Sequence, residues 1–311
     1  MKRIVFAGAG HANIVALRSL ARARSRAALV LVNDGPYAWY TGALPALIRG
    51  DIGKASARID LPALAAACGA TFVQARTCSF DDHRLNLQNQ ATLPFDYLVL
   101  STGSTKLAGG VKPIPEFLQR IAAMDRLASP HIGIIGGGAA GSELALALRH
   151  RLGSAARITI EAGKILPHAP SRARHLAEQA LAAANIMVVT KLQETCDDII
   201  HAYTPVPALQ IRNTLQLAAN NDVFAAGDIA ALPQPLPRSG AIAVRQGRLL
   251  AVNLQRAMAG RRLQAFQPPS HILAIMSIKK DEALAWYGNW TMRGRIPAFV
   301  KQRLDGRWTK T

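Results

Sequence analysis

Short apolar runs alternate along this chain with longer stretches in which apolar residues recur every three or four positions. The first run covers residues 4–7, a helical pattern follows over 11–24, and a second run covers 29–32. The same order returns in mid-chain, where an apolar run at 132–135 precedes a helical pattern over 142–151. Buried strands that alternate with amphipathic helices are typical of parallel sheets in α/β proteins. The pattern therefore predicts two units that each begin strand, turn, helix, strand.

The rest of the chain is interpreted by the same periods and by its glycine and proline residues. Further strands are predicted at residues 71–74, 80–87, 97–100, 157–160, 186–189 and in the run before Gly227. Further helices are predicted at residues 44–48, 61–68, 171–184 and 240–258. The fold class predicted from these elements is α/β, with two Rossmann-like dinucleotide-binding domains.

A glycine-rich turn follows the first strand of each unit. The first turn contains Gly8 and Gly10, and the second contains Gly136, Gly138 and Gly141. Such a turn lets backbone N–H groups approach a pyrophosphate, and the helix N-terminus behind it favours negative charge. Two of these turns in one chain predict two dinucleotides held face to face, with electrons passing between them.

Two acidic residues accompany the second turn. Glu161 ends the next strand 20 residues after Gly141, where a carboxylate accepts hydrogen bonds from ribose hydroxyls and repels a 2′-phosphate. This spacing favours NAD over NADP, although Lys164 nearby softens the preference. Glu143 lies in the first turn of the helix and is a second candidate. The alternatives are a solvated strand-end acid for Glu161 and a charge that complements the helix dipole for Glu143.

The first turn departs from the usual pattern. His11 follows the second glycine, and Asn13 stands where a third glycine is expected. Asn33 lies 23 residues after Gly10, at the strand end where an acid normally holds the ribose, and Asp34 follows it directly. Asp34 is the substitute carboxylate in this interpretation. Taken alone, the first turn is equally consistent with a tight turn that binds nothing.

Composition narrows the class of protein. The chain has 311 residues, half of them hydrophobic, which is typical of about two globular domains. The first strand begins close to Met1, so we expect no signal peptide and a cytoplasmic location. The three cysteines, Cys68, Cys78 and Cys196, form no C-x-x-C pair and are interpreted as thiols of a reducing compartment.

The net charge of +18 points to anionic partners. An anionic membrane surface, an acidic redox partner and nucleic acid are the candidates. Neither zinc-finger spacing nor an RNA-recognition aromatic motif accompanies the charge, so we predict no nucleic-acid partner.

One further motif gives the two turns a context. A strand ending in Ala226-Gly227-Asp228, downstream of Thr102-Gly103, resembles the pyridine nucleotide–disulfide oxidoreductase superfamily. Within it the chain is most similar to type II NADH dehydrogenase-like flavoproteins, and above all to the flavoprotein domain fused to some selenide, water dikinases. The matching stretches are residues 8–13, 40–45, 136–148, 222–228, 243–247 and the tail 266–308, which together extend over nearly the whole chain.

The resemblance implies cofactors and the residues around them. Gly227 and Asp228 would bind FAD, and Thr102-Gly103 would mark the crossover to the NAD(H) domain. Pro45 and Gln246 are implied to lie in the flavin environment, beside a helix whose N-terminus begins near residue 240. The domains expected are an FAD-binding domain in two parts, an inserted NAD(H)-binding domain and a basic tail. The FAD-binding domain is expected at residues 1–104 and 220–265, the NAD(H)-binding domain at 105–219 and the tail at 266–311.

The function implied is an FAD-dependent NAD(P)H oxidoreductase that passes electrons from NADH through FAD to a quinone or another small acceptor. Hydride transfer needs ring orientation and water exclusion, which suits a sequence without a Ser/His/Asp or metal-ligand constellation. Where the family usually has a second Ala-Thr-Gly, residues 201–207 contain no glycine. The alternative is therefore a non-catalytic or sensory flavin-binding protein with a degenerate NAD site.

The tail combines apolar residues at helical spacing with basic residues between them. The apolar positions are Ile296, Phe299, Val300, Leu304 and Trp308. A basic amphipathic helix with tryptophan suits the interface of a membrane, which here would be its inner face. The alternative is a helix packed on the FAD domain. A homodimer is a further partner hypothesis.

Overall fold

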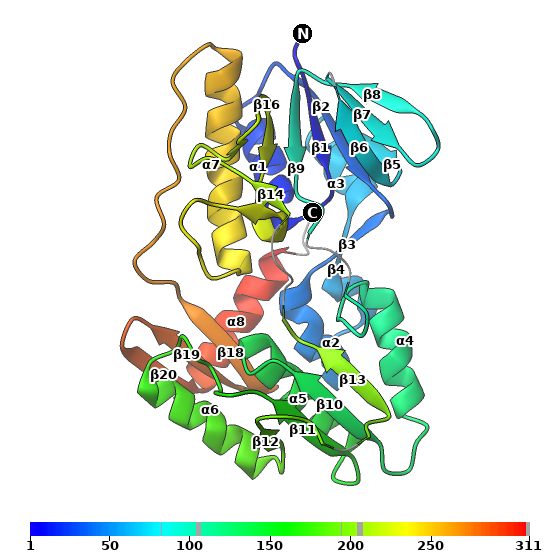
Figure 1. Ribbon diagram of the computed structural model, residues 1–311, viewed down its shortest axis with the longest axis vertical. Coiled ribbons are helices and arrows are strands. Elements are labelled where there is room, and N and C mark those ends of the chain that lie inside the picture. The colour runs from blue at the N-terminus through cyan, green and yellow to red at the C-terminus, as the bar shows by residue number, and fades with distance from the viewer. Residues whose placement is uncertain (82, 104–106, 194, 204–207, 309–311) are drawn as a thin grey trace.

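The computed structural model describes residues 1–81, 83–103, 107–193, 195–203 and 208–308. The chain forms two halves that lie one above the other along the longest axis (Figure 1). Each half contains its own parallel sheet, and each sheet contributes to a separate hydrophobic core. The predicted pair of Rossmann-like units is confirmed.

The first sheet has six strands in the order β15-β16-β9-β1-β2-β5. They are β1 (Arg3–Ala7), β2 (Ala28–Asn33), β5 (Thr71–Gln74), β9 (Tyr97–Leu100), β15 (Gln216–Leu217) and β16 (Asn220–Ala225). All pairs are parallel except β15 with β16. Residues 4–7 are fully buried, as expected for a parallel strand covered on both faces. The helices α1 (His11–Arg22) and α7 (Gly240–Met258) pack against each other beside this sheet (Figure 1).

The second sheet has four parallel strands in the order β12-β11-β10-β13. They are β10 (His131–Ile135), β11 (Arg157–Glu161), β12 (Met187–Val189) and β13 (Asp198–His201). The helices of this half are α4 (Ile114–Met124), α5 (Ala139–Leu152) and α6 (Ser171–Ala183). The helix α5 begins directly at the glycine turn, three residues before the predicted position 142.

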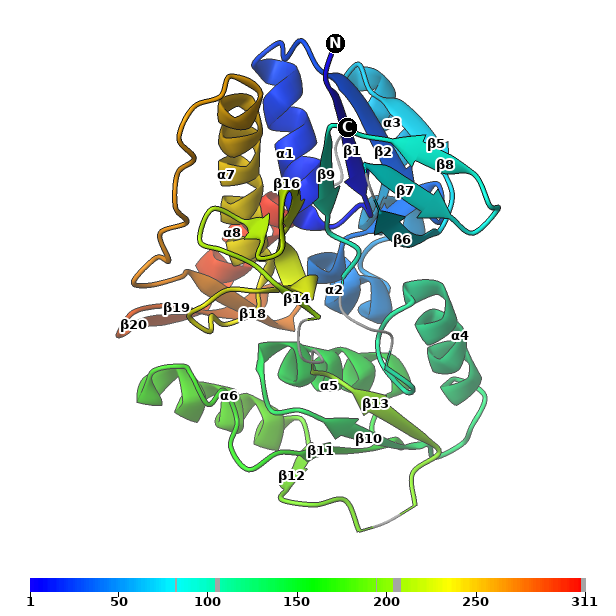
Figure 2. The ribbon, with the colours of Figure 1, turned by 45° about the horizontal axis from the view of Figure 1, so that its top comes forward.

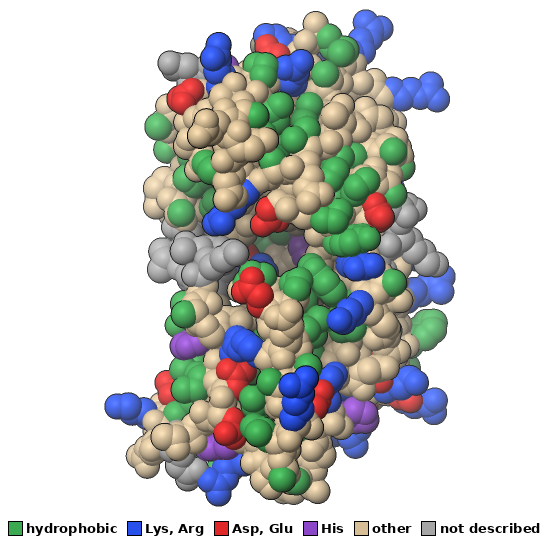
Figure 3. All heavy atoms as spheres, turned by 90° about the vertical axis from the view of Figure 1, so that its right-hand side faces the viewer, with side chains coloured by type: hydrophobic (Ala, Val, Ile, Leu, Met, Phe, Trp, Pro, Cys, Tyr) green, Lys and Arg blue, Asp and Glu red, His purple; other side chains and the backbone are tan. Residues whose placement is uncertain are grey.

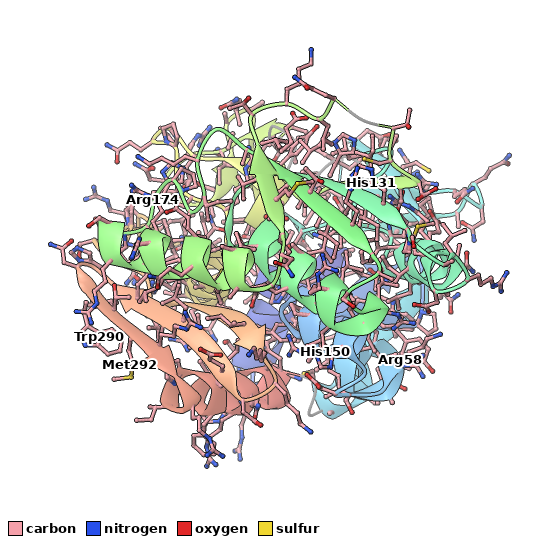
Figure 4. All side chains as sticks on the ribbon, turned by 90° about the horizontal axis from the view of Figure 1, so that it is seen from below. Arg58, His131, His150, Arg174, Trp290 and Met292 are labelled. Atoms are coloured by element: carbon pink, nitrogen blue, oxygen red, sulfur yellow. The ribbon has the colours of Figure 1, made fainter. Side chains whose placement is uncertain are left out.

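The tail folds as a unit of its own. Its antiparallel sheet contains β18 (Ala274–Lys279), β19 (Glu282–Tyr287) and β20 (Trp290–Gly294), and α8 (Arg295–Trp308) follows. The sheet covers α5 and α6, with Trp290 and Met292 toward its outer side (Figure 4). The sequence predicted the helix but not the three strands.

Short elements connect these layers. In the first half they are β3 (Tyr37–Trp39), η1 (Thr41–Ala43), α2 (Leu44–Arg49), η2 (Lys54–Ala57), β4 (Arg58–Asp60), α3 (Leu61–Ala67) and β8 (Thr92–Pro94). After the second sheet come β14 (Leu209–Gln210), η3 (Gly227–Ile229) and β17 (Ala230–Ala231). The helix α2 packs on α5 and so joins the two halves (Figure 2).

The structure corrects the prediction of one strand at residues 80–87. β6 (Thr77–Asp81) and β7 (Arg84–Leu87) are antiparallel partners, with Asp81 opposite Arg84. His83, between them, has a positive φ of 65°. The chain therefore reverses direction between β6 and β7, with His83 in the reversal, and does not continue as one strand.

The chain also returns to the first half earlier than the boundary predicted at residue 219. β14 pairs with β17, and β15 pairs with β16 of the first sheet. The apolar side chains of Ile211 and Leu215 belong to the first core. The second half is accordingly shorter than the predicted range 105–219.

Candidate active site

The first glycine turn packs tightly against the segment that follows β9. The Gly8 N–H group donates to the Val32 carbonyl at 2.8 Å, and the Gly10 N–H group donates to the Ser101 carbonyl at 3.1 Å. Gly8 has a φ of +84°, and a Cβ there would lie 2.7 Å from the Ser101 carbonyl oxygen and from Thr102 Cα. Only glycine fits this approach, so the predicted neighbours Gly8 and Thr102 are brought together.

The N-terminus of α1 lies open behind this turn. Its N-cap is Gly10, and no side chain caps the first turn. The first backbone N–H groups of an uncapped helix are available to an anion. The position of this helix N-terminus and the absence of a Cβ on Gly8 and Gly10 fit the pyrophosphate of FAD.

Asn13, which stands where a third glycine is expected, holds the turn through hydrogen bonds of its side chain. The residue is fully buried, and its Nδ2 donates to the carbonyl oxygens of Ala7, Gly8 and Val99 at 3.1, 2.8 and 3.2 Å. These bonds connect the turn at Gly8 with the end of β1 and with β9, and the Ala7 carbonyl also accepts from the Ser101 N–H group at 2.9 Å. The Asn13 amide nitrogen therefore fixes the turn, whereas its Oδ1 is buried without a hydrogen-bond partner among the described residues, and its role toward FAD stays a prediction.

Asn33 is used in a similar way. Its Oδ1 accepts from the Ala9 N–H group at 3.1 Å, and its Nδ2 donates to the Gly35 carbonyl at 2.9 Å. Asp34, the next residue, is exposed. Of the two predicted ribose ligands, Asp34 has the accessible carboxylate, and its role stays a prediction.

The Gly227-Asp228 segment arrives at the same edge of the first sheet. The Ala226 N–H group donates to the Leu100 carbonyl at 3.0 Å, and the Gly227 N–H group donates to Gln246 Oε1 at 2.8 Å. Asp228 pairs with Lys112 at 3.4 Å. Gly103, with a φ of +83°, has Lys112 Nζ 4.0 Å from its ideal Cβ position. The predicted FAD residues thus converge, and the buried Gln246 fixes the loop that carries Asp228.

Aromatic residues line the space beside the first turn. His11 and Tyr40 have ring centroids 5.5 Å apart, and Gly240 at the start of α7 lies 3.8 Å from His11 Nε2, measured from its ideal Cβ position. Pro45 is buried in the first turn of α2, a few residues beyond Tyr40. The N-terminus of α7 is capped by Ser239, whose Oγ accepts from the Ile242 N–H group at 3.3 Å. The α7 N-terminus therefore faces the same region as His11.

The second glycine turn has the geometry of a dinucleotide site. The Gly136 N–H group donates to the Glu161 carbonyl at 3.0 Å, and a Cβ on Gly136 would lie 3.0 Å from the Ala202 carbonyl oxygen. Gly138 is the N-cap of α5, which has no side-chain cap. A Cβ on Gly141 would overlap the Gly136 carbonyl oxygen. This turn also presents open N–H groups to an anion.

The two predicted acids of the second turn have different surroundings. Glu161 stands at the end of β11, where its Oε2 accepts from the Leu192 N–H group at 3.0 Å. Glu143 is directed toward the tail, where its Oε1 accepts from the Ser277 N–H group at 2.6 Å and lies 3.6 Å from Lys301 Nζ. Glu161 keeps a position suited to a ribose. The NAD(H) role of Glu143 stays a prediction, and its observed partners belong to β18 and α8.

A chain of contacts connects the first residue of α1 with Glu143, the fifth residue of α5. His11 contacts Tyr40, and the Tyr40 hydroxyl donates to Asp305 Oδ1 at 2.7 Å. Asp305 lies 3.4 Å from Lys301, which in turn pairs with Glu143. The space-filling view shows a hollow across the middle of the molecule, between the two halves (Figure 3). The two glycine turns therefore belong to one region.

Sequence reasoning missed three members of this region. Tyr40 is predicted only as part of the matching stretch 40–45, and neither Lys301 nor Asp305 is predicted as a site residue. Lys301 and Asp305 are four residues apart, and Trp308 follows three residues later. This spacing places the three side chains on one face of a helix. That spacing was the available signal, but nothing local indicates which surface the face meets. Of the segment 201–207, where the family usually has a second Ala-Thr-Gly, residues 204–207 lie outside the described part of the chain.

Comparison with known proteins agrees with this geometry. The family described as pyridine nucleotide-disulphide oxidoreductase matches residues 2–200. The chain is 28% identical to demethylphylloquinone reductase NdbB of Synechocystis sp. (strain ATCC 27184 / PCC 6803 / Kazusa), with 68% of each protein covered.

Two solved structures illustrate the likeness of fold. The sulfide:quinone oxidoreductase of Aquifex aeolicus has a TM-score of 0.82 at 16% identity, covering 99% of this chain and 90% of its own. NDH2 of Plasmodium falciparum in complex with NADH has a TM-score of 0.79 at 10% identity, covering 100% and 95% respectively. At such identities the likeness is one of fold.

We expect Asn13→Asp to destabilise the protein by about 3 kcal/mol, because a carboxylate would face three carbonyl oxygens without the amide donors. Asn13→Gly, which removes the bonds but leaves no charge, should cost about 1 kcal/mol. Urea unfolding of both variants measures the difference. Asn289→Asp, at an exposed position, is the control. Equal stability of Asn13→Asp and wild type would contradict the role of Asn13.

The burial of His11 should make stability depend on pH. Burial, assisted by Lys112, lowers the pKa of His11 to about 4 from 6.5, so folding favours the neutral ring. This contribution is present above pH 6.5 and is lost as the pH falls through 6.5 toward 4, by on the order of 3 kcal/mol in full. His11→Gln should therefore lose less stability than wild type between pH 7 and pH 5 in urea unfolding.

The exposed His150 provides the matched control for this measurement (Figure 4). His150→Gln should follow the wild-type dependence on pH. If His11→Gln and His150→Gln give the same slope as wild type, the buried ring of His11 does not cause the loss.

Proposed function

Because the chain belongs to the pyridine nucleotide-disulphide oxidoreductase family, we propose that it passes electrons from NADH through FAD to a quinone. The family membership makes the chain an enzyme of the pyridine-nucleotide-dependent flavoprotein class, with FAD and NAD(H) as its cofactors. The observation that carries the proposal is the pair of uncapped helix N-termini behind the two glycine turns, joined by the contacts from His11 to Glu143.

The protein's own contribution is to bind, orient and exclude water. FAD, when bound, supplies a ring that accepts a hydride and passes electrons on. The open N–H groups of α1 and α5 would hold the two pyrophosphates, and Asp228 would meet the FAD chain near Lys112. The N-terminus of α7 would favour negative charge on the side of the ring that it faces. No acid–base pair is required for such a transfer.

NADH is the proposed donor because of Glu161. Its carboxylate is held at the end of β11 by the Leu192 N–H group, in the position where the two ribose hydroxyls would be bound. A 2′-phosphate at that place would meet a negative charge. Lys164 is close to the turn, since its carbonyl oxygen is 2.5 Å from the ideal Cβ position of Gly137.

A quinone is the proposed acceptor for two reasons. Demethylphylloquinone reductase is the named activity of the similar Synechocystis protein. No disulfide joins Cys68, Cys78 or Cys196 in the described part of the chain, and this arrangement does not favour a disulfide relay.

We also propose that α8 brings the protein to an anionic membrane. Its outer face exposes Ile296 by 66%, Phe299 by 62%, Leu304 by 43% and Val300 by 37%. Exposed basic residues flank this outer face of α8; they are Arg295, Arg303 and Arg307. Apolar side chains between arginines suit the headgroup region of an anionic bilayer. In the described part of the chain, no helix has the length and apolarity needed to cross a membrane.

The electron-transfer proposal predicts that NADH bleaches the visible band of bound FAD without oxygen, and that a water-soluble quinone then restores the band. Gly141→Ala should stay yellow but should be reduced far more slowly, since its Cβ collides with the Gly136 carbonyl oxygen. Stopped-flow absorbance measures both steps. Bound FAD that neither NADH nor NADPH reduces would instead support the sensory flavin-binding alternative. A protein that takes up no FAD would reject both.

The membrane proposal predicts that the protein floats with vesicles containing phosphatidylglycerol, and less with phosphatidylcholine alone. Ile296→Ser combined with Phe299→Ser should abolish flotation without loss of FAD. Met187→Ser combined with Ile199→Ser removes two other exposed apolar side chains, 47% and 39% exposed, from the second sheet and should change nothing. Absence of wild-type flotation, or an equal effect of both double variants, counts against a membrane role for α8.

A further inference from the structure

The helix α8 connects the tail to the edge of the first sheet. It begins next to β20, packs on β18, β19 and β20, and ends in the middle of the molecule (Figures 1 and 2). Pro297 and Ala298 are buried near its start, whereas Trp308 at its end packs against the core of the first half. The last turn of α8 therefore lies close to the first glycine turn.

Three side chains on one face of α8 make this contact. Lys301, Asp305 and Trp308 follow each other at spacings of four and three residues, which aligns them along the helix. The Tyr40 hydroxyl donates to Asp305 at 2.7 Å, and Lys301 Nζ donates to the Gly42 carbonyl at 3.3 Å. This inner face of α8 is therefore fixed to the loop that precedes α2.

The charges behind this contact are largely withdrawn from water. The side chains of Lys301 and Glu143 are each 13% exposed, and that of Asp305 is 20% exposed. Burial raises the pKa of Glu143 and of Asp305, while the Lys301 ammonium opposes both shifts. Removing one member of such a group leaves a buried charge unpaired, which is strongly unfavourable. The position of α8 is accordingly well determined.

Trp308 closes an aromatic group around His11. Its ring stacks on Tyr40, with centroids 5.8 Å apart and 13° between the planes. It also meets His11 edge-on, with centroids 4.8 Å apart. His11 is the first residue of α1 and adjoins Gly240 at the start of α7. The indole thus lies where the N-termini of α1 and α7 approach each other.

We propose that Trp308 contacts FAD and that, with Tyr40, it forms an aromatic wall of the flavin pocket. A planar ring such as that of FAD binds most tightly to an aromatic side chain that is already held in place, because that side chain loses little conformational freedom on binding. Lys301 and Asp305 are positioning residues for this wall, since they hold the last turn of α8 on Tyr40. The inference rests on the proposed FAD site, and it assigns to the end of the tail a part of that site.

The test compares two tryptophans of the same tail. Trp308→Ala should weaken FAD binding about tenfold, which corresponds to 1.4 kcal/mol, and should brighten the emission of bound flavin because a stacked indole quenches it. Trp308→Phe keeps a ring and should stay within about threefold of wild type. Trp290→Ala removes an indole that is 51% exposed and should leave both readings unchanged. FAD release from the holoprotein and flavin fluorescence measure the effects.

Asp305→Ala tests the positioning role. It should brighten bound flavin as Trp308→Ala does, whereas Asp305→Asn, which still accepts from Tyr40, should keep the wild-type emission. Circular dichroism of each variant confirms that α8 remains folded.

Three outcomes separate the claims. Unchanged affinity and emission in Trp308→Ala would overturn the inference, and tighter FAD binding in that variant would mean that the indole occupies the pocket instead of lining it. A wild-type protein that takes up no FAD would reject the proposed function itself, before any variant is compared.

Discussion

The structure depends on one line of contacts between its two halves, from His11 through Tyr40, Asp305 and Lys301 to Glu143. His11 is the first residue of α1 and Glu143 is the fifth residue of α5, so both lie close behind the two glycine turns. Two dinucleotide sites are useful for electron transfer only when their rings meet, because transfer requires close and oriented approach. In the proposed function, the inner face of α8 would supply that alignment.

This arrangement gives the helix α8 of the basic tail two different faces. Toward the protein, α8 carries Lys301 between two buried carboxylates whose cost of burial it offsets. Toward solvent it carries Ile296 and Phe299 among arginines. The two interpretations offered by the sequence, a membrane helix and a helix packed on the FAD domain, therefore concern opposite faces of one helix and do not exclude each other.

The sequence predicted well whatever is determined locally. The glycine turns, the helix at 240–258 and the paired parallel units follow from periods and turn residues that act within a few positions. It predicted poorly what distant contacts decide. Tyr40 and Asp305 are 265 residues apart, and Glu143 and Ser277 are 134 apart, so no local pattern indicates their pairing.

The small sheet of the tail was missed for a related reason. Its strands contain alanine and serine among the apolar residues, and they are buried by packing on α5, α6 and α8. Asn13 illustrates the converse, because this departure from the glycine pattern suggests a lost site but is accompanied by three hydrogen bonds from its side chain to Gly8 in the turn, to β1 and to β9.

The most direct test of the account is a crystal structure of the protein with FAD and NAD⁺. We expect the FAD pyrophosphate on Gly8 and Gly10, the NAD⁺ pyrophosphate on Gly136 and Gly138, and the two rings facing each other beside the Tyr40–Asp305 contact. A dinucleotide bound at the opposite turn, or rings held apart by the two halves, would contradict it.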